Sequence, residues 1–493
     1  MIATNVTTVH RWVRRWLTVG VLAALTVLAG PVTAAQPVPA RSGTAQQLAK
    51  IDALFGQWDG THAPGGAVAV IQDEQVVFAR GYGMADLEQG VPITVDTVFS
   101  LASVSKQFTA AATLLLVDAG RLRLDDKVRT YIPELPEYAS QVTVSHLLHH
   151  TSGIRDFFQL RALAGHSDAD TLSMSEVLRL LSRQHGLIFA PGESYAYSNT
   201  GYELLGLLVE RVSGQSLQVF CEQNIFRPLG MAHTQFYDDR SKIIPRRAVG
   251  HMFRPDGTLG IFRSSFALVG SGGLMSTVGD LALWDANFYH NILGRDRARF
   301  SQLQLATVPL KDGTPSKYAA GLIIGSYRGL PTVLHAGRSF GFRTQMVRFP
   351  QQHFSVIVLS NRYDADPQTL IDAITDLWLG DKFTQPAVPP PTARPPAAKA
   401  APAQMEASKL SGYAGKYYND ELDATYVVQP CGGGLCIQVL DAAPQPFNVE
   451  RPDVFVSAQT DLIRATFTRK GRRIDGFNFD HGALRNLRFE RQP

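Results

Sequence analysis

A serine and a lysine stand three residues apart where a long apolar stretch begins, in Ser103-Val104-Ser105-Lys106. On a helix this spacing puts both side chains on one face, one turn apart. The N-terminus of a helix supplies positive potential and free amide N–H groups, which stabilise an oxyanion. A serine hydroxyl becomes a nucleophile when a base takes its proton, and a desolvated, neutral lysine can be that base. Taken singly, a helix-capping serine beside an exposed lysine is the simpler interpretation.

Two further segments carry side chains that suit the same chemistry. Tyr197 and Asn199 lie in a loop directly before an apolar helical pattern. A phenol can relay protons, and a carboxamide can both donate and accept hydrogen bonds. His335 and Gly337 lie at the end of a strand pattern. The missing side chain of Gly337 predicts that a substrate backbone can approach there.

Taken together, these residues resemble the three motifs of the active-site-serine penicillin-recognising hydrolases, which include class C β-lactamases, DD-peptidases and D-aminopeptidases. In the family's order, the motifs here are Ser103-Val104-Ser105-Lys106, Tyr197-Ser198-Asn199 and His335-Ala336-Gly337. Shorter stretches over 147–153, 228–231 and 272–276 are also similar to the family. The resemblance covers about residues 45–379.

The resemblance implies a role for each matching residue. Ser103 attacks the substrate carbonyl and forms an acyl-enzyme. Lys106 and Tyr197 share the proton transfers, and which of the two is the base stays open. Asn199 holds either the substrate amide or Lys106. The backbone N–H groups of Ser103 and Arg338 form the oxyanion hole, a feature worth on the order of 3–4 kcal/mol per donor.

The third motif departs from the family pattern. β-Lactamases and many DD-peptidases have lysine followed by threonine or serine there, whereas this chain has His335 and Ala336. Because histidine is mostly neutral at pH 7, we expect weaker attraction for a substrate carboxylate and weaker β-lactamase activity. His335 and Gly337 are still expected to contact the substrate, since the His-x-Gly pattern is similar to that of certain DD-peptidases, D-aminopeptidases and esterases.

The resemblance therefore implies a serine hydrolase acting on small amides or short peptides, including peptides of D-amino acids. It implies no metal and no organic cofactor. The alternatives are a carboxylesterase or β-lactamase of the same fold, and a non-catalytic penicillin-binding sensor or scaffold. Intact Ser103, Lys106 and Tyr197 argue against the scaffold, because drift after loss of catalysis would have changed at least one of them.

Other patterns suggest chemistry that we do not expect. Ser339 stands in a Gly-Arg-Ser-Phe-Gly run that matches the nucleophile elbow of α/β-hydrolases, but that motif needs a helix after it. The following residues, 342–349, alternate apolar and polar and predict a strand. His146, His149 and His150 have a spacing that could suit a metal, but no glutamate lies between them as in the helical zinc-protease motif, so we expect a structural role.

Three aromatic residues, Tyr82, Tyr202 and Phe340, could line a substrate cleft, and we expect ordinary packing of the core or rim from each of them.

Helices and strands must bring these motifs together. The patterns predict strands over 66–71, 75–79, 332–336, 342–349 and 354–359, and helices over 106–119, 200–213 and 367–379. A capping box over 277–280 predicts a further helix to residue 288. Strands do not alternate regularly with helices, so a doubly wound parallel sheet is disfavoured. We predict an α/β fold of the α+β type, with an antiparallel sheet of five or more strands and helices on both faces.

The C-terminal part is predicted to be a separate domain. A Pro/Ala-rich linker over 386–404 separates the hydrolase domain, 45–383, from a small β-barrel or sandwich over 405–493. Its strand patterns lie over 413–418, 424–428, 435–440, 454–457, 462–468, 474–479 and 487–489. The basic run over 469–473 is predicted to be a solvated hairpin turn. Cys431 and Cys436 flank three glycines and could form a hairpin disulfide, while Cys221 is expected to be buried.

The first 34 residues predict export. Three arginines precede an apolar stretch of about 13 residues and a small-residue cleavage site, which is typical of a signal peptide. The 493 residues carry a formal net charge of +4, and three of the positive charges lie in this segment. A nearly neutral mature chain does not favour nucleic-acid binding. We therefore expect a soluble periplasmic or secreted protein without stable membrane insertion, its oligomeric state left open.

Overall fold

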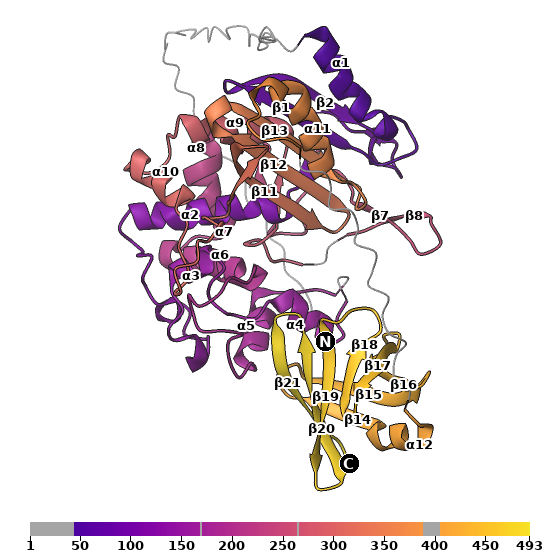
Figure 1. Ribbon diagram of the computed structural model, residues 1–493. Coiled ribbons are helices and arrows are strands. Elements are labelled where there is room, and N and C mark those ends of the chain that lie inside the picture. The colour runs from indigo at the N-terminus through magenta and orange to yellow at the C-terminus, as the bar shows by residue number, and fades with distance from the viewer. Residues whose placement is uncertain (1–43, 168–169, 264–265, 388–404) are drawn as a thin grey trace, which may run out of the picture. The chain divides into compact units, whose positions relative to one another are not determined.

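The computed structural model describes residues 44–167, 170–263, 266–387 and 405–493 (Figure 1). The expected signal peptide over 1–34 and most of the expected linker over 386–404 lie outside the described residues. None of the helices in the described ranges combines the length and the apolar character that crossing a bilayer requires.

Six antiparallel strands form the central sheet, in the order β10-β11-β12-β13-β1-β2. They are β1 (Gly66–Gln72), β2 (Gln75–Tyr82), β10 (Ile323–Tyr327), β11 (Leu330–Ser339), β12 (Phe342–Phe349) and β13 (Phe354–Ser360). The first two strands pair with the late ones, because β1 lies against β13 from Gly66 opposite Ser360 to Gln72 opposite Phe354. The predicted antiparallel sheet of five or more strands is confirmed.

Helices cover both faces of this sheet because its strands are apolar on both (Figure 1). Along β1, Ala67 and Ala69 enter the core that also contains side chains of α2, α6 and α9. Val68 and Val70 point the other way, into a core shared with α1 and α11. The helices are α1 (Ala45–Leu54), α2 (Lys106–Asp118), α3 (Val144–Leu148), α4 (Phe157–Leu163), α5 (Met174–Ser182), α6 (Asn199–Ser213), α7 (Leu217–Cys221), α8 (Arg227–Leu229), α9 (Val278–Tyr289), α10 (Arg297–Leu305), α11 (Pro367–Leu379) and α12 (Ala407–Leu410).

Two local predictions need correction. The helix predicted over 106–119 is confirmed as α2 (Lys106–Asp118), but Ser103, which was expected to share a helix face with Lys106, lies in the 3-10 turn η2 (Ala102–Ser105) that precedes it. At α9 only half of the predicted capping box forms. Thr277 accepts the N–H of Asp280, but the Asp280 carboxylate accepts instead from the backbone N–H of His233.

Short strands make three small sheets beside the main one. They pair β3 (Met84–Asp86) with β4 (Val91–Pro92), β7 (His251–Phe253) with β8 (Leu259–Ile261), and β9 (Leu274–Ser276) with both β5 (Phe99–Ser100) and β6 (Gln235–Phe236). The backbone N–H of Leu101 also donates to the carbonyl of Leu274. The pairing of β5 with β9 and the bond from Leu101 to Leu274 hold the stretch before Ser103 beside the glycine-rich segment 270–273.

The C-terminal part is a closed antiparallel barrel (Figure 1). Its strands are β14 (Gly415–Asn419), β15 (Ala424–Cys431), β16 (Gly434–Val439), β17 (Gln445–Arg451), β18 (Val454–Ser457), β19 (Ile463–Lys470), β20 (Arg473–His481) and β21 (Leu484–Arg491). The sequence patterns missed β17, because Pro446 and its polar neighbours weaken the strand signal. Cys431 and Cys436 form a disulfide across the β15–β16 hairpin, and Cys221 is buried as expected.

Candidate active site

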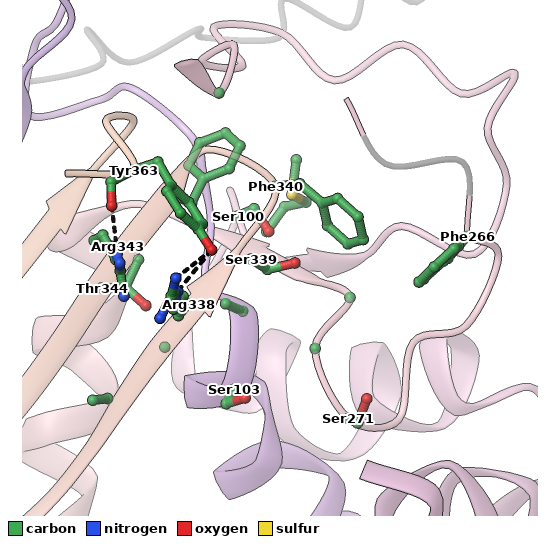
Figure 2. A pocket seen from close by; sticks show the side chains of 18 of the residues that line it. Ser100, Ser103, Phe266, Ser271, Arg338, Ser339, Phe340, Arg343, Thr344 and Tyr363 are labelled. Carbon is green, nitrogen blue, oxygen red and sulfur yellow. Dashed lines mark hydrogen bonds between the residues drawn. The ribbon is translucent and has the colours of Figure 1, made fainter. Parts of the chain in front are cut away.

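A cavity of about 920 Å³ opens where η2, β11 and the segment 270–273 meet, and Ser103 lies on its wall (Figure 2). Tyr197, Asn199, His335 and Gly337 line the same cavity. The three motifs, which are far apart in sequence, are therefore brought together around one space. A pocket of this size can hold a small molecule or a short peptide.

The turn that carries Ser103 is fixed by side-chain hydrogen bonds on both sides. Ser105 donates its hydroxyl to the carbonyl of Ala102 at 2.6 Å and accepts the N–H of Leu274 at 3.0 Å. Ala102, directly before the nucleophile candidate, has a φ of +48°, a conformation that costs a non-glycine residue about 1 kcal/mol or more. The surrounding bonds hold this turn against that strain.

Lys106 is fully buried and has three polar partners. Its Nζ lies 2.9 Å from Asn199 Oδ1, 2.7 Å from the carbonyl oxygen of Ser271 and 3.2 Å from Ser103 Oγ. A neutral amine has two N–H donors and one lone pair. The amide and carbonyl oxygens can only accept, so they take both donors. The lone pair then faces the serine hydroxyl, as a base for Ser103 requires.

The electrostatics around Lys106 favour that neutral form. Burial lowers the pKa of Lys106 to about 7, although the carboxylates of Glu203 and Asp156 act to raise it. Neither carboxylate bonds to the amine. Glu203 accepts the backbone N–H groups of Gly270 and Ser271, each at 2.9 Å. None of the sequence motifs includes Glu203, and its only sequence signal is an acidic residue directly before the apolar run 204–209 of α6.

Tyr197 lies against both Ser103 and Lys106. Its hydroxyl is hydrogen-bonded to the Ser103 side chain, and the centroid of its ring is 4.8 Å from Lys106 Nζ. Part of the ring faces the cavity, yet desolvation of the hydroxyl raises the pKa of Tyr197 above its usual range, and the bond to Ser103 offsets only part of this rise. A phenol with a raised pKa stays protonated at neutral pH and is suited to donate a proton. Of the two roles left open for Asn199, its contact is with Lys106.

His335 lines the cavity as a buried, neutral group. Its Nδ1 lies 2.7 Å from the carbonyl oxygen of Ala336, so Nδ1 carries the proton, and its Nε2 accepts from the hydroxyl of Tyr318 at 2.9 Å. Burial and the nearby Lys106 lower the pKa of His335 to about 3. His335 therefore offers no positive charge to a substrate carboxylate. Tyr318, which fixes the imidazole, was not among the predicted site residues.

Gly337 lines the cavity as predicted, and close packing gives a second reason for the missing side chain. A Cβ at this position would lie 2.3 Å from the carbonyl oxygen of Leu101 and 2.3 Å from Thr344 Oγ1, far inside contact distance. The Thr344 hydroxyl also donates to the Leu101 carbonyl at 2.7 Å. The missing side chain lets β11 approach the turn that carries Ser103, and the approach of a substrate at Gly337 stays a prediction.

Five arginines line the cavity, Arg240, Arg247, Arg263, Arg338 and Arg343, and the last two stand opposite each other on β11 and β12. Figure 2 shows both side chains beside Tyr363. Arg338 Nε donates to the Tyr363 hydroxyl at 2.9 Å, and Arg343 Nε donates to the Tyr363 carbonyl at 2.7 Å. Among the described residues, neither guanidinium has an ion pair with a carboxylate at 4.0 Å or less. Arg338 contributes this side chain in addition to the backbone N–H expected for the oxyanion hole.

The other suggested residues lie partly on the cavity wall and partly in the packed interior. Ser339 lies on the cavity wall, but a strand follows it and not a helix. His146 and His149 lie at helix α3, and no group of three or more His, Cys, Asp or Glu in the described ranges is arranged to hold a metal. The remaining aromatic candidates divide as follows: Tyr82 and Tyr202 are buried in the core, whereas Phe340 lines the cavity.

Comparison with known proteins identifies the family. The Beta-lactamase family model matches residues 51–377, which is most of the hydrolase domain. The chain belongs to this family. The match spans all three motifs and ends within α11, so the central sheet and the cavity are family features.

The individual relatives are distant in sequence. A D-aminopeptidase of Gluconobacter oxydans is 28% identical over 66% of this chain and 60% of its own length. A D-aminopeptidase of Brucella anthropi is 25% identical over 81% of this chain and 72% of its own length. The octameric penicillin-binding protein homologue from Pyrococcus abyssi has the same fold, with a TM-score of 0.57 and 23% identity over 90% of this chain and 98% of its own.

Proposed function

We propose that this protein is an exported serine hydrolase that cleaves small amides or short peptides, including those of D-amino acids, through an acyl-enzyme on Ser103. One observation carries the proposal: the buried amine of Lys106 has two partners that only accept hydrogen bonds, and its third partner is the Ser103 hydroxyl. The distant similarity to two D-aminopeptidases supports the substrate class.

The proposed reaction starts with neutral Lys106. As Ser103 Oγ attacks the substrate carbonyl, its proton passes to Lys106 Nζ, and the backbone N–H groups of Ser103 and Arg338 stabilise the oxyanion. The Tyr197 hydroxyl, hydrogen-bonded to Ser103, delivers a proton to the leaving amine and is reprotonated from Lys106. Water then attacks the ester, giving its proton to the same pair of groups, and the acid product leaves with Ser103 restored.

The charges on the cavity wall indicate which substrates fit. Because His335 is neutral, the positive partners for the anionic end of a substrate are arginines of the cavity wall, and of these Arg338 and Arg343 lie on the strand that carries His335 and on its neighbour. We infer that substrates with a free carboxylate beyond the scissile bond bind with that group beside Tyr363. This differs from anchoring by a lysine at the third motif, which supports the low β-lactamase activity expected from the sequence.

Intact-mass spectrometry combined with a substrate panel tests the function. The purified chain is treated with a fluorophosphonate and with a penicillin, and is assayed on D- and L-alanine p-nitroanilides and a p-nitrophenyl ester. We expect one fluorophosphonate adduct on Ser103 and turnover that is faster for the D-amide than for the L-amide. The Ser339→Ala variant is the matched control and should be labelled normally. A stable penicillin adduct without turnover of any substrate would identify a binding protein, and turnover of esters alone a carboxylesterase.

A further inference from the structure

A barrel residue, Glu421, forms a buried ion pair with the hydrolase domain. Glu421 follows β14, and its Oε2 lies 2.5 Å from Arg155 Nη1 and accepts the backbone N–H of His185 at 2.8 Å. Arg155 Nη1 also donates to Gln184 Oε1 at 2.8 Å. The side chains of Arg155 and Glu421 are only 9% and 5% exposed. Such a pair is expensive to break from one side, because the remaining charge is left buried without a partner.

Arg155 and the next residue, Asp156, contact the segment that carries Asn199, the partner of Lys106. The carbonyl oxygen of Arg155 accepts the hydroxyl of Thr200 at 2.9 Å. The carboxylate of the next residue, Asp156, accepts the backbone N–H of Asn199 at 2.5 Å. Asn199 in turn accepts from Lys106 Nζ at 2.9 Å. A continuous series of contacts therefore runs from the barrel to the amine that faces Ser103.

Apolar packing joins the same two parts. Leu160, Leu163 and Ala164, on and directly after α4, belong to the hydrophobic core of the barrel. The hydroxyl of Tyr426, on β15, donates to the carbonyl of Leu163 at 2.7 Å. Helix α4 begins at Phe157, immediately after Asp156. The barrel thus contacts both the Arg155 side chain and helix α4, which follows Asp156.

We propose that Glu421 is a positioning residue for the active site, so that the barrel sets the place of Asn199 and Lys106 through Arg155. The inference rests on the proposed function and deepens it by giving the barrel a part in catalysis. The Arg155 guanidinium bonds to the side chains of Glu421 and Gln184. Without Glu421 it keeps only Gln184 and moves toward water, displacing Asp156. Asn199 follows, and the lone pair of Lys106 no longer faces Ser103.

The test compares three substitutions in the full-length chain. Glu421→Ala removes the pair, Glu421→Gln keeps an oxygen that accepts from Arg155 and His185, and Asp423→Asn is the control. Asp423 lies in the same loop and pairs with Arg183 at 3.2 Å, but its side chain is 54% exposed, and among the described residues its polar contacts do not include Arg155 or Asp156. Values of kcat and KM for a p-nitrophenyl ester are measured per active site, counted by fluorophosphonate titration, well below the melting temperature of each variant.

We expect Glu421→Ala to lower kcat at least tenfold with KM changed less than threefold, Glu421→Gln to stay within threefold of wild type, and Asp423→Asn within twofold. A kcat for Glu421→Ala within threefold of wild type would overturn the proposal, as would equal losses in Glu421→Ala and Asp423→Asn. If Glu421→Ala does not fold, Glu421→Asp decides, since it keeps the charge but cannot reach both partners: a fivefold or larger fall supports the proposal, and an unchanged kcat overturns it. Wild-type protein without labelling or turnover would instead refute the proposed function.

Discussion

Replacing Lys106 with methionine tests the proposed base through two quantities that depend on one pKa. An ordinary lysine, with a pKa of about 10.4, has roughly one neutral amine in 2,500 at pH 7. With the pKa of Lys106 lowered to about 7 by burial, about half of the molecules hold the neutral amine at that pH. The difference amounts to about 5 kcal/mol in favour of the neutral form. At pH 7 the fraction of molecules with a neutral amine beside Ser103 is roughly a thousand times larger than for an ordinary lysine.

The first consequence is the acid limb of the rate profile. With a p-nitrophenyl ester, which has no titrating group, kcat/KM of the wild-type enzyme should rise tenfold per pH unit below about 7 and level off above it. His150 and His335 should not contribute, because burial lowers the pKa of both. Lys106→Met should abolish the limb together with at least 99% of the activity. A limb centred below pH 5 or above pH 9, or a limb that survives in Lys106→Met, would refute the role of Lys106.

The second consequence is a stability that rises with pH. Lys106 is neutral in the folded chain above pH 7 but protonated in the unfolded chain up to about pH 10.4, so unfolding takes up a proton in this window. The free energy of unfolding therefore gains up to about 1.4 kcal/mol per pH unit from this group as the pH rises. Between pH 7.5 and 9.5, wild type should gain about 2 kcal/mol relative to Lys106→Met in urea unfolding. Equal pH dependence in the two proteins would mean that the folded lysine is charged.

Three further substitutions should separate chemistry from packing. Ser103→Ala should abolish fluorophosphonate labelling and turnover while the melting temperature stays within about 2 °C, whereas Ser339→Ala should keep most activity; activity lost only in the second would reverse the assignment. Arg343→Gln should raise KM about tenfold for substrates with a free carboxylate and leave KM unchanged for the matching carboxamides; equal effects on both would exclude a carboxylate contact. Gly337→Ala should lower the free energy of unfolding by about 1–3 kcal/mol and kcat by more than tenfold, as urea unfolding and initial rates will show; a variant as stable and active as wild type would contradict the close packing.

The sequence alone predicted the parts of the site that local patterns encode. The spacing of Ser103 and Lys106, the loop before α6 and the end of β11 each carry a recognisable set of residue types, and the bounds of α11 follow from its caps and apolar period. The antiparallel sheet followed from the order of strands and helices. These features depend on neighbours within one turn or one strand, where propensity and periodicity act.

The features that were missed depend on contacts between distant segments. Glu203 lies directly before the apolar run of α6, and its position is explained by the backbone N–H groups of Gly270 and Ser271, which it accepts. His335 is neutral as expected, but its burial and its hydrogen bond with the Tyr318 hydroxyl were missed, because its own motif shows neither. A glycine at this position suits both the approach of a substrate backbone and the close packing of two segments. The packing of Gly337 against the segment before Ser103 depends on the position of η2, which the sequence does not show.

The arrangement of the buried carboxylates explains how Lys106 can remain a base. A carboxylate in direct contact with Nζ would favour the ammonium form, which has no lone pair for the Ser103 proton. Here the oxygens of Glu203 and Asp156 are occupied by backbone N–H groups, from the segment after residue 269 and from α4 and α6. The amine is left with uncharged partners, and desolvation then outweighs the more distant negative charge. The backbone donors around these two carboxylates therefore support the proposed role of Lys106 as the base.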